Sequence, residues 1–233
     1  MTISFTIVSD GGDHPSSAGP IGAKVRVAVI FAVLVALYGN QQPAGAASNA
    51  TQPVPVTQEQ VEGTVHVCST CHGFGGRSIS PTFPRLAGQQ KDYLVAQLTA
   101  FRDKTRADPH ARTYMWGMAA HLTDPMIEAV AAYYSGLPPV AGEPGTSPEI
   151  AVGAKIFAEG ILSAGTPPCM GCHSAKAEGA GPIPRLAGQH RAYLAHQLEA
   201  FASNARANEI MHENSKSLTP EQISEVTAFL ATQ

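Results

Sequence analysis

The sequence predicts an all-α chain made of two tandem, homologous helical domains. The pentapeptide Cys-x-x-Cys-His occurs twice, at Cys68–His72 and at Cys169–His173, and the same string of residues follows each copy. The segments after each copy carry apolar residues at helical spacing, and none shows the apolar–polar alternation of a half-buried strand. Each pentapeptide is therefore expected at the centre of its own helical domain.

The two pentapeptides are typical attachment sites for c-type haem. The thiols of such a motif add to the vinyl groups of a haem, and the histidine binds the iron from one side. We therefore predict two covalent haems c, with His72 and His173 as iron ligands. A zinc site or a disulfide framework is a poorer explanation, because neither needs a histidine directly after each pair. The motifs use all four cysteines of the chain, which are Cys68, Cys71, Cys169 and Cys172.

The charge of the chain restricts its partners. The 233 residues hold 15 Lys and Arg against 18 Asp and Glu, which gives a net charge of −3 at pH 7. No basic patch is visible in the sequence. Nucleic acid is therefore not an expected partner.

Residues 1–46 are predicted to be an export signal with a long polar start. Two basic residues precede the apolar run Val27–Tyr38, which is too short to cross a bilayer. Ala44–Ala46 then supplies a small-x-small cleavage site. We expect cleavage and a periplasmic location, with an uncleaved anchor as the alternative. Residues 47–55 are predicted to form a flexible tail.

An internal repeat divides the rest of the chain into two domains. The string Pro84-Arg-Leu-Ala-Gly-Gln89 returns as Pro184-Arg-Leu-Ala-Gly-Gln189, together with the helical pattern after it. A period of about 100 residues is too long for a solenoid and indicates two homologous domains. We place the domains at 56–136 and 147–233. The stretch 137–146 is rich in Pro and Gly, which is typical of a linker.

Each domain is predicted to begin and to end with a helix. Thr57 and Gln60 fit a capping box before the first helix, and Ser147 followed by Pro148 gives the second domain a matching start. Helices are also expected over 89–102 and 189–203, and the last helices begin near Thr123 and at Thr219. The predicted core stripes are Leu94, Leu98, Phe101, Ile127, Val130 and Tyr134, and Leu194, Leu198, Phe201, Ile223, Val226 and Leu230.

Each haem iron needs a second axial ligand or an open face. Met115 lies seven residues before Leu122, and Met211 lies seven before Leu218, so the two methionines occupy twin positions. Cytochromes c pair histidine with methionine, which favours Met115 and Met211 as ligands. The choice between Met115 and Met118 stays open. The remaining candidates are Met126, His110 and His121 in the first domain, and His190, His196 and His212 in the second.

The repeated string also supplies candidate partners around the haems. An iron-bound histidine usually donates its other ring N–H to a carbonyl, and Pro84 and Pro184 are candidates for that carbonyl. Arg85 and Arg185 follow them and are candidate donors to haem propionates. A solvated surface arginine is the alternative for each.

Two closed irons favour electron transfer over catalysis. A thioether ligand stabilises ferrous iron, and it leaves no position for oxygen, peroxide or a substrate. We therefore expect an outer-sphere electron carrier and not an enzyme. A peroxidase-type diheme enzyme would need one iron with an open face.

Together these motifs resemble those of diheme cytochromes c, and most closely the cytochrome c4 family. The resemblance covers nearly the whole chain from Val56 onward. It implies two tandem class I cytochrome c domains, each wrapped around one covalent haem, in a periplasmic carrier of the respiratory chain. One departure is Ser174, which follows His173 where the family often has glycine.

The resemblance also implies redox proteins as partners. The donors would be a quinol-oxidising complex or a dehydrogenase, and the acceptor would be a terminal oxidase. Contact with the membrane would occur only through these partner complexes. The alternative function is that of a cytochrome c subunit in a dehydrogenase complex.

Overall fold

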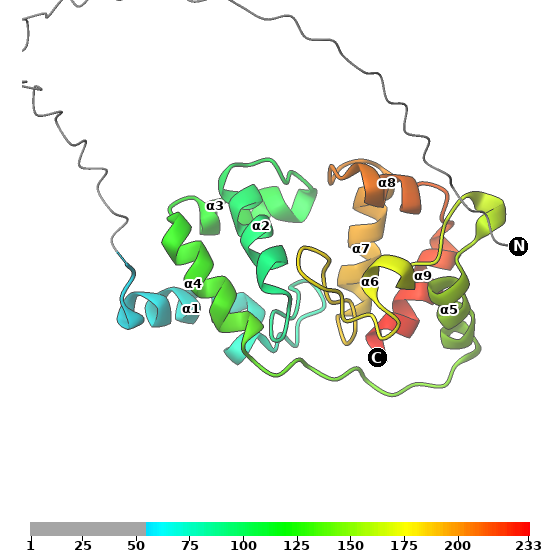
Figure 1. The fold of residues 1–233 in the computed structure, drawn as a ribbon, viewed down its shortest axis with the longest axis horizontal. Helices are drawn as coiled ribbons and strands as arrows, with labels where there is room; N and C mark the ends of the chain where they lie inside the picture. The colour runs from blue at the N-terminus through cyan, green and yellow to red at the C-terminus, as the bar shows by residue number, and fades with distance from the viewer. Residues whose placement is uncertain (1–54) are drawn as a thin grey trace, which may run out of the picture. The chain divides into compact units, whose positions relative to one another are not determined.

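The computed structural model describes residues 55–233. The predicted export signal at 1–46 and all but the last residue of the predicted tail lie outside the described residues. Over 55–233 the chain forms helices and two isolated bridge pairs, and no strand (Figure 1). The predicted all-α fold class is confirmed. None of the helices in this range is long and apolar enough to cross a membrane.

The first domain contains four α-helices, one 3₁₀ turn and one π-helical turn. A 3₁₀ turn follows the first haem motif, and a π-helical turn precedes α3. The elements in chain order are α1 (Gln58–His72), the 3₁₀ turn (Phe74–Gly76), α2 (Lys91–Arg102), the π-helical turn (Ala111–Met115), α3 (Trp116–Ala119) and α4 (Asp124–Ser135).

The second domain repeats this order with small changes. Its elements are α5 (Pro148–Glu159), a 3₁₀ turn (Leu162–Ala164), α6 (Met170–His173), α7 (Arg191–Ala202), α8 (Glu209–Ser215) and α9 (Pro220–Ala231). Helices α7 and α9 pack together, as α2 and α4 do in the first domain.

The predicted helix starts are confirmed. The Thr57 hydroxyl accepts from the backbone N–H of Gln60 at 3.2 Å, and the Gln60 side chain accepts from the Thr57 N–H at 2.8 Å. Ser147 caps α5, whose first residue is Pro148. The last helices, α4 and α9, are capped by Thr123 and Thr219. Each cap satisfies a backbone donor that the helix itself leaves unpaired.

The two haem motifs reach their positions by different routes. Helix α1 runs through the whole first motif and ends on His72, whereas α5 ends at Glu159 and the loop 160–169 leads to the separate short helix α6. Gly160 ends α5 with φ of 71°, and a Cβ there would lie 2.4 Å from the carbonyl oxygen of Thr166. The sequence analysis did not predict this extra loop, although Gly160 directly after the helix is a local stop signal that could have indicated it.

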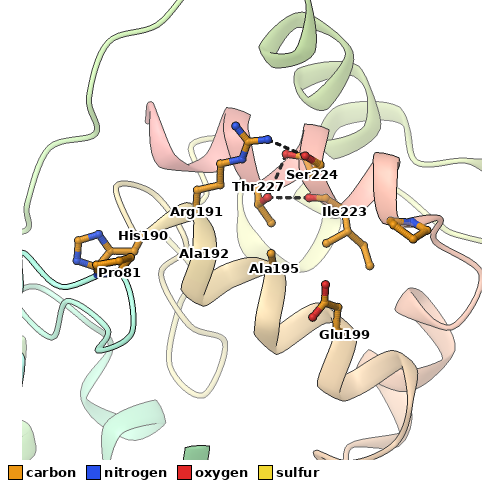
Figure 2. Close-up of a pocket in the computed structure, with 10 residues that line it drawn as sticks. Pro81, His190, Arg191, Ala192, Ala195, Glu199, Ile223, Ser224 and Thr227 are labelled. Atoms are coloured by element: carbon orange, nitrogen blue, oxygen red, sulfur yellow. Dashed lines mark hydrogen bonds between the residues drawn. The ribbon is translucent and has the colours of Figure 1, made fainter.

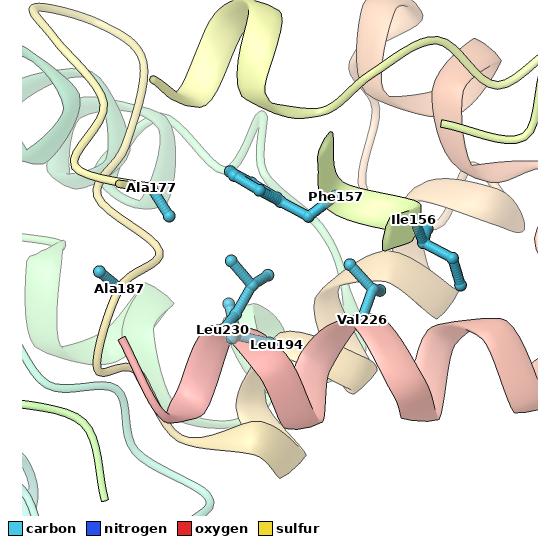
Figure 3. Packing of buried hydrophobic residues seen from close by; sticks show 7 residues of the cluster. All are labelled: Ile156, Phe157, Ala177, Ala187, Leu194, Val226 and Leu230. Carbon is cyan, nitrogen blue, oxygen red and sulfur yellow. The ribbon is translucent and has the colours of Figure 1, made fainter. Parts of the chain in front are cut away.

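The apolar stripes form the cores as predicted. In the second domain Leu194, Val226 and Leu230 pack against Ile156 and Phe157 (Figure 3). In the first domain, the residues that form the core are Val65, Leu94, Val130, Ala131 and Tyr134. A smaller cluster of Phe101, Ala111 and Ala119 lies beside Met115.

One set of contacts joins the two domains through buried arginines. The Gln197 side-chain oxygen accepts from Arg106 at 2.7 Å and from Arg206 at 2.6 Å, and the Gln97 side-chain oxygen also accepts from both guanidinium groups. Of these two arginines, only Arg106 has a carboxylate partner among the described residues, which is Asp108 at 2.9 Å. The equivalent position holds Asn208, whose amide is uncharged, although both side chains accept from a backbone N–H three residues on, that of Ala111 or of Met211. The domain contact is therefore nearly symmetric in its donors but not in its charge.

Ser174 has a backbone conformation that normally requires glycine. Its φ and ψ are 69° and 157°, close to the 75° and 160° of Gly73 at the equivalent place after the first motif. This region costs a residue with a Cβ about 1–3 kcal/mol. The loop after the second motif therefore keeps the geometry of the first one, at the expense of strain at Ser174.

Replacing Ser174 with glycine is expected to stabilise the second domain. Relief of strain outweighs the extra freedom of glycine in the unfolded chain, which leaves a net gain of about 1 kcal/mol. Denaturant unfolding of the holoprotein, followed by circular dichroism, measures the change. The control is Ser163→Gly, a change at an exposed serine, which should not stabilise. Equal effects of the two variants would contradict the strain at Ser174.

Asp108 is predicted to stabilise the domain contact in a pH-dependent way. Burial alone would raise the pKa of Asp108, but the charge and hydrogen bond of Arg106 outweigh it and hold the pKa below its usual range. The stabilisation is therefore present above the pKa of an unfolded aspartate, about 4. It is lost as the pH falls through the lower pKa of the folded state.

Asp108→Asn should lower the free energy of unfolding at pH 7 by about 2 kcal/mol, because Arg106 loses a buried, charged hydrogen-bond partner. The deficit should shrink in titrations below pH of about 4. The control Asp103→Asn removes an exposed partner of Arg102 and should change stability by less than about 0.5 kcal/mol. A deficit that does not depend on pH would contradict an ionised Asp108.

Candidate haem sites

Each motif histidine is buried and held by a proline carbonyl. The Nδ1 of His72, at the end of α1, lies 2.9 Å from the carbonyl oxygen of Pro84. The Nδ1 of His173, at the end of α6, lies 3.1 Å from that of Pro184. A carbonyl can only accept, so Nδ1 carries the proton and donates it. The lone pair of each ring is thereby left on Nε2, the nitrogen that can bind a metal.

Burial also sets the charge of these rings. Desolvation lowers the pKa of His72 and of His173, and the bond to the proline carbonyl opposes this only in part. Both imidazoles are therefore neutral at neutral pH. The neutral form is the one that metal ligation requires.

The four cysteines all lie in the described part of the chain, are not joined by disulfides and differ in exposure. Cys68 and Cys169 lie half-buried against the two apolar cores, and burial raises the pKa of both thiols. Cys71 and Cys172 are exposed. No group of three or more His, Cys, Asp or Glu side chains within residues 55–233 could hold a metal ion. The four thiols are thus not arranged as a zinc site.

The two predicted methionines lie at the start of the segment that leads to the last helix. Met115 is the last residue of the π-helical turn and is half-buried against Trp116 and the Phe101 cluster. Single π-helical turns occur frequently at functional sites. Met211 lies in α8, where its N–H donates to the Asn208 side chain at 2.9 Å. By contrast, 49% of Met118 is exposed.

Most of the other candidate ligands have contacts of their own. His190 Nε2 lies 2.9 Å from the carbonyl oxygen of Ser78, and His212 Nδ1 lies 2.9 Å from that of Phe201. The rings of His110 and His196 stack on each other, with centroids 3.9 Å apart. The last two candidates are Met126, which packs against the first core, and His121, which is exposed.

The two arginines of the repeated strings have unequal surroundings. Arg85 is not a solvated surface residue, since its side chain is 14% exposed and its Nη1 donates to the Gly188 carbonyl at 2.6 Å. The Nε of Arg185 is buried and has no hydrogen-bond partner among the described residues. A buried guanidinium donor requires an acceptor, and a haem propionate would be a suitable one. The residues around both motifs therefore fit a covalently bound haem c.

The last residue of each repeated string reaches into the other domain. The side-chain oxygen of Gln89 accepts from the Arg185 N–H at 2.7 Å, and its amide donates to the Arg185 carbonyl at 2.9 Å. Gln189 does the same with Arg85, at 2.8 Å and 2.9 Å. We call these four bonds the glutamine clasp. The sequence analysis did not predict these bonds. The recurrence of a polar glutamine at the end of both strings is a signal that could have indicated a shared contact.

The clasp explains why the whole string is repeated. The Pro84 carbonyl holds the histidine, the Arg85 peptide meets the other domain, and the N–H groups of Leu86 and Ala87 donate to the Gly76 carbonyl. Gly88 has φ of 68°, and a Cβ there would lie 2.6 Å from Pro139 in the linker. Only glycine fits that position.

A surface pocket elsewhere has no link to the haem motifs. It has a volume of about 490 Å³ and is lined by Pro81 and by residues of α7 and α9 (Figure 2). Its most prominent polar contact joins Arg191 to Ser224 at 2.6 Å. None of the motif cysteines, histidines or predicted methionines lines it. The functional site is therefore defined by the motifs and not by this pocket.

Comparison with known proteins agrees with this geometry. A sequence model described as cytochrome c matches residues 39–137 and 150–233. Cytochrome c-552 of Acidithiobacillus ferridurans is 36% identical over 88% of this chain and 87% of its own. A thiosulfate dehydrogenase electron acceptor of Thiomonas intermedia is 35% identical over 71% of this chain and 78% of its own.

A solved structure gives the same result. The structure of cytochrome c4 from Acidithiobacillus ferrooxidans matches with a TM-score of 0.68 and 39% identity, over 71% of this chain and 98% of that one. The repeated motifs, the helical architecture and these matches agree with one another. The chain therefore belongs to the cytochrome c family and is a cytochrome of the cytochrome c4 type, an electron carrier with two covalently bound haems c.

Proposed function

We propose that this chain transfers electrons between respiratory donors and a terminal oxidase or another acceptor, with both haem irons closed by protein ligands. The axial pairs are His72 with Met115 and His173 with Met211. In this role the chain has no catalytic site of its own, and each domain holds one electron. A haem iron that keeps two protein ligands exchanges electrons through its edge and binds no substrate.

The observation that carries the proposal is the repetition of the same ligand pair in both domains. Each motif histidine is neutral, with its Nδ1 proton donated to a proline carbonyl. Each domain then offers a half-buried methionine ahead of its last helix. A fixed, neutral imidazole and an uncharged thioether require little rearrangement when the charge on the iron changes.

The surroundings of the methionines favour Met115 over Met118. Met115 packs beside Phe101 and Ala111, whereas Met118 is 49% exposed. A half-buried thioether is better suited to bind iron out of contact with water. Bound haem c itself supplies an iron that alternates between the ferric and ferrous states, and a thioether raises its reduction potential.

A periplasmic location goes with this role. The predicted export signal at 1–46 would carry the chain out of the cytoplasm. In bacteria, haem is attached to such motifs outside the cytoplasm. The donors would be a quinol-oxidising complex or a dehydrogenase. Any contact with the membrane would be made through these partners.

A second candidate function is favoured by one relative. The protein from Thiomonas intermedia is named a thiosulfate dehydrogenase electron acceptor. In this role the chain would accept electrons from an enzyme of that class and pass them on. Stopped-flow mixing with a thiosulfate dehydrogenase, and separately with oxidase-containing membranes, distinguishes the two roles. Reduction by the enzyme at a rate that exceeds its turnover would support the second role.

The axial methionines can be tested by single substitutions to leucine. The oxidised wild-type protein should show the weak long-wavelength band of iron bound to a thioether, and the reduced protein should not bind carbon monoxide. Met115→Leu and Met211→Leu should each remove about half of this band and open one of two irons to carbon monoxide.

The control for this test is Met118→Leu, which should leave the band and the ligand binding unchanged. If Met118→Leu removes half of the band while Met115→Leu does not, the first-domain ligand is Met118. A wild-type protein in which one iron binds carbon monoxide would contradict the carrier function.

A further inference from the structure

We propose that each domain tunes the haem of the other domain through the glutamine clasp. Gln89 acts on the second-domain haem through His173, and Gln189 acts on the first-domain haem through His72. The inference rests on the proposed role of these histidines as axial ligands. It assigns both glutamines as positioning residues that act in trans.

One peptide group in each string contacts both the motif histidine and the glutamine of the other domain. The Pro184 carbonyl, which accepts from His173, and the Arg185 N–H, which donates to Gln89, belong to the same peptide group. Hydrogen bonds therefore run in one line from the Gln89 oxygen through this peptide to the His173 ring. The Pro84–Arg85 peptide links Gln189 to His72 in the same way.

Hydrogen bonds in such a line reinforce one another. When the N–H of a peptide donates to a good acceptor, the peptide is polarised and its carbonyl becomes a stronger acceptor. Both glutamines are well shielded from water, at 7% and 6% exposed. A buried bond of this kind is not weakened by competing solvent, so the polarisation reaches the histidine.

The second bond of each glutamine fixes its direction. The Gln89 amide also donates to the Arg185 carbonyl at 2.9 Å, so the side chain is held at both ends of one residue. Gln189 is held on Arg85 in the same way. Each side-chain oxygen also accepts from the N–H of the next residue, Gln90 at 2.9 Å or His190 at 3.0 Å, so it cannot turn away without breaking three bonds. The clasp is therefore a defined contact and not one of several rotamers.

The effect on the iron follows from the basicity of the imidazole. A stronger acceptor at Nδ1–H makes the ring a more basic ligand. A more basic ligand favours ferric iron and lowers the reduction potential. Loss of a glutamine should therefore raise the potential of the haem in the opposite domain and leave the haem of its own domain nearly unchanged.

The test compares Gln89→Leu with Gln189→Leu in the holoprotein. Redox titrations followed by NMR report on each haem separately, through the methyl resonances of that haem. Gln89→Leu should raise the second-domain potential, and Gln189→Leu should raise the first-domain potential. The expected size is up to tenfold in the one-electron equilibrium constant, or about 59 mV.

A neighbouring glutamine supplies the control. Gln90 also bonds across the domain contact, to the Glu178 carbonyl at 2.9 Å, but it does not touch a Pro–Arg peptide. Gln90→Leu should shift neither potential. Its result separates a specific effect of the clasp from a general loosening of the contact between domains.

A second variant covers the case in which Gln89→Leu does not fold. Gln89→Met keeps the length of the side chain and removes both of its bonds to Arg185. It should raise the second-domain potential, as Gln89→Leu does. A shift confined to the domain of the substituted glutamine, equal shifts of both haems, or no shift would each overturn the inference.

A separate optical measurement distinguishes failure of this inference from failure of the proposed function. The thioether band of the wild-type protein tests the ligands themselves and does not involve the glutamines. If that band is absent, the proposed function fails. If it is present and the crossed pattern of shifts is missing, only the trans effect of the clasp fails.

Discussion

The structure depends on one peptide group in each domain, the bond between the proline and the arginine of the repeated string. Its carbonyl oxygen fixes the ring of the motif histidine, and its N–H is bound by a glutamine of the other domain. The orientation of an iron ligand and the contact between the domains therefore share the same few atoms. A buried peptide group must have partners on both sides, and here each partner has its own function.

Both domains keep this peptide group and its two partners, whereas the loops and charges around it differ between the domains. Ser174 adopts the strained conformation that Gly73 adopts freely, because the loop must still bring the second string back to His173. The loop 160–169 lengthens the approach to the second motif without moving the histidine away from Pro184. Asp108, whose counterpart in the second domain is the uncharged Asn208, makes the charge around the paired arginines unequal. The two domains are thus built alike in geometry and differ in charge at their contact.

Much of the fold could be predicted from the sequence, because its signals are local. Two kinds of local signal predicted the helices. Capping residues such as Thr57 and Thr219 mark where helices begin, and an apolar stripe such as Leu94, Leu98 and Phe101 marks the buried face of one. The haem motifs are just as local. The sequence also pointed to the proline carbonyls, and the structure places both of them next to the motif histidines.

The contact between the domains could not be predicted in the same way. The repeat indicated that the string has a function, and its arginines were predicted to donate hydrogen bonds to haem propionates. Nothing in a single sequence states that Gln89 meets Arg185, which lies 96 residues away. The π-helical turn that ends at Met115 was not predicted either, because its residues have no pattern that distinguishes it from an ordinary helix. Long-range pairing and unusual helical turns depend on packing, which periodicity does not report.

The two haem domains are joined through the Pro–Arg peptide groups. Amide hydrogen exchange of Arg85 and Arg185, measured by NMR on the reduced holoprotein, reports on this contact. Both amides should exchange slowly, like the buried amides of α4 and α9, because each is bound to a buried glutamine of the other domain. Exchange of either amide as fast as that of an exposed loop would show that the clasp does not hold in solution.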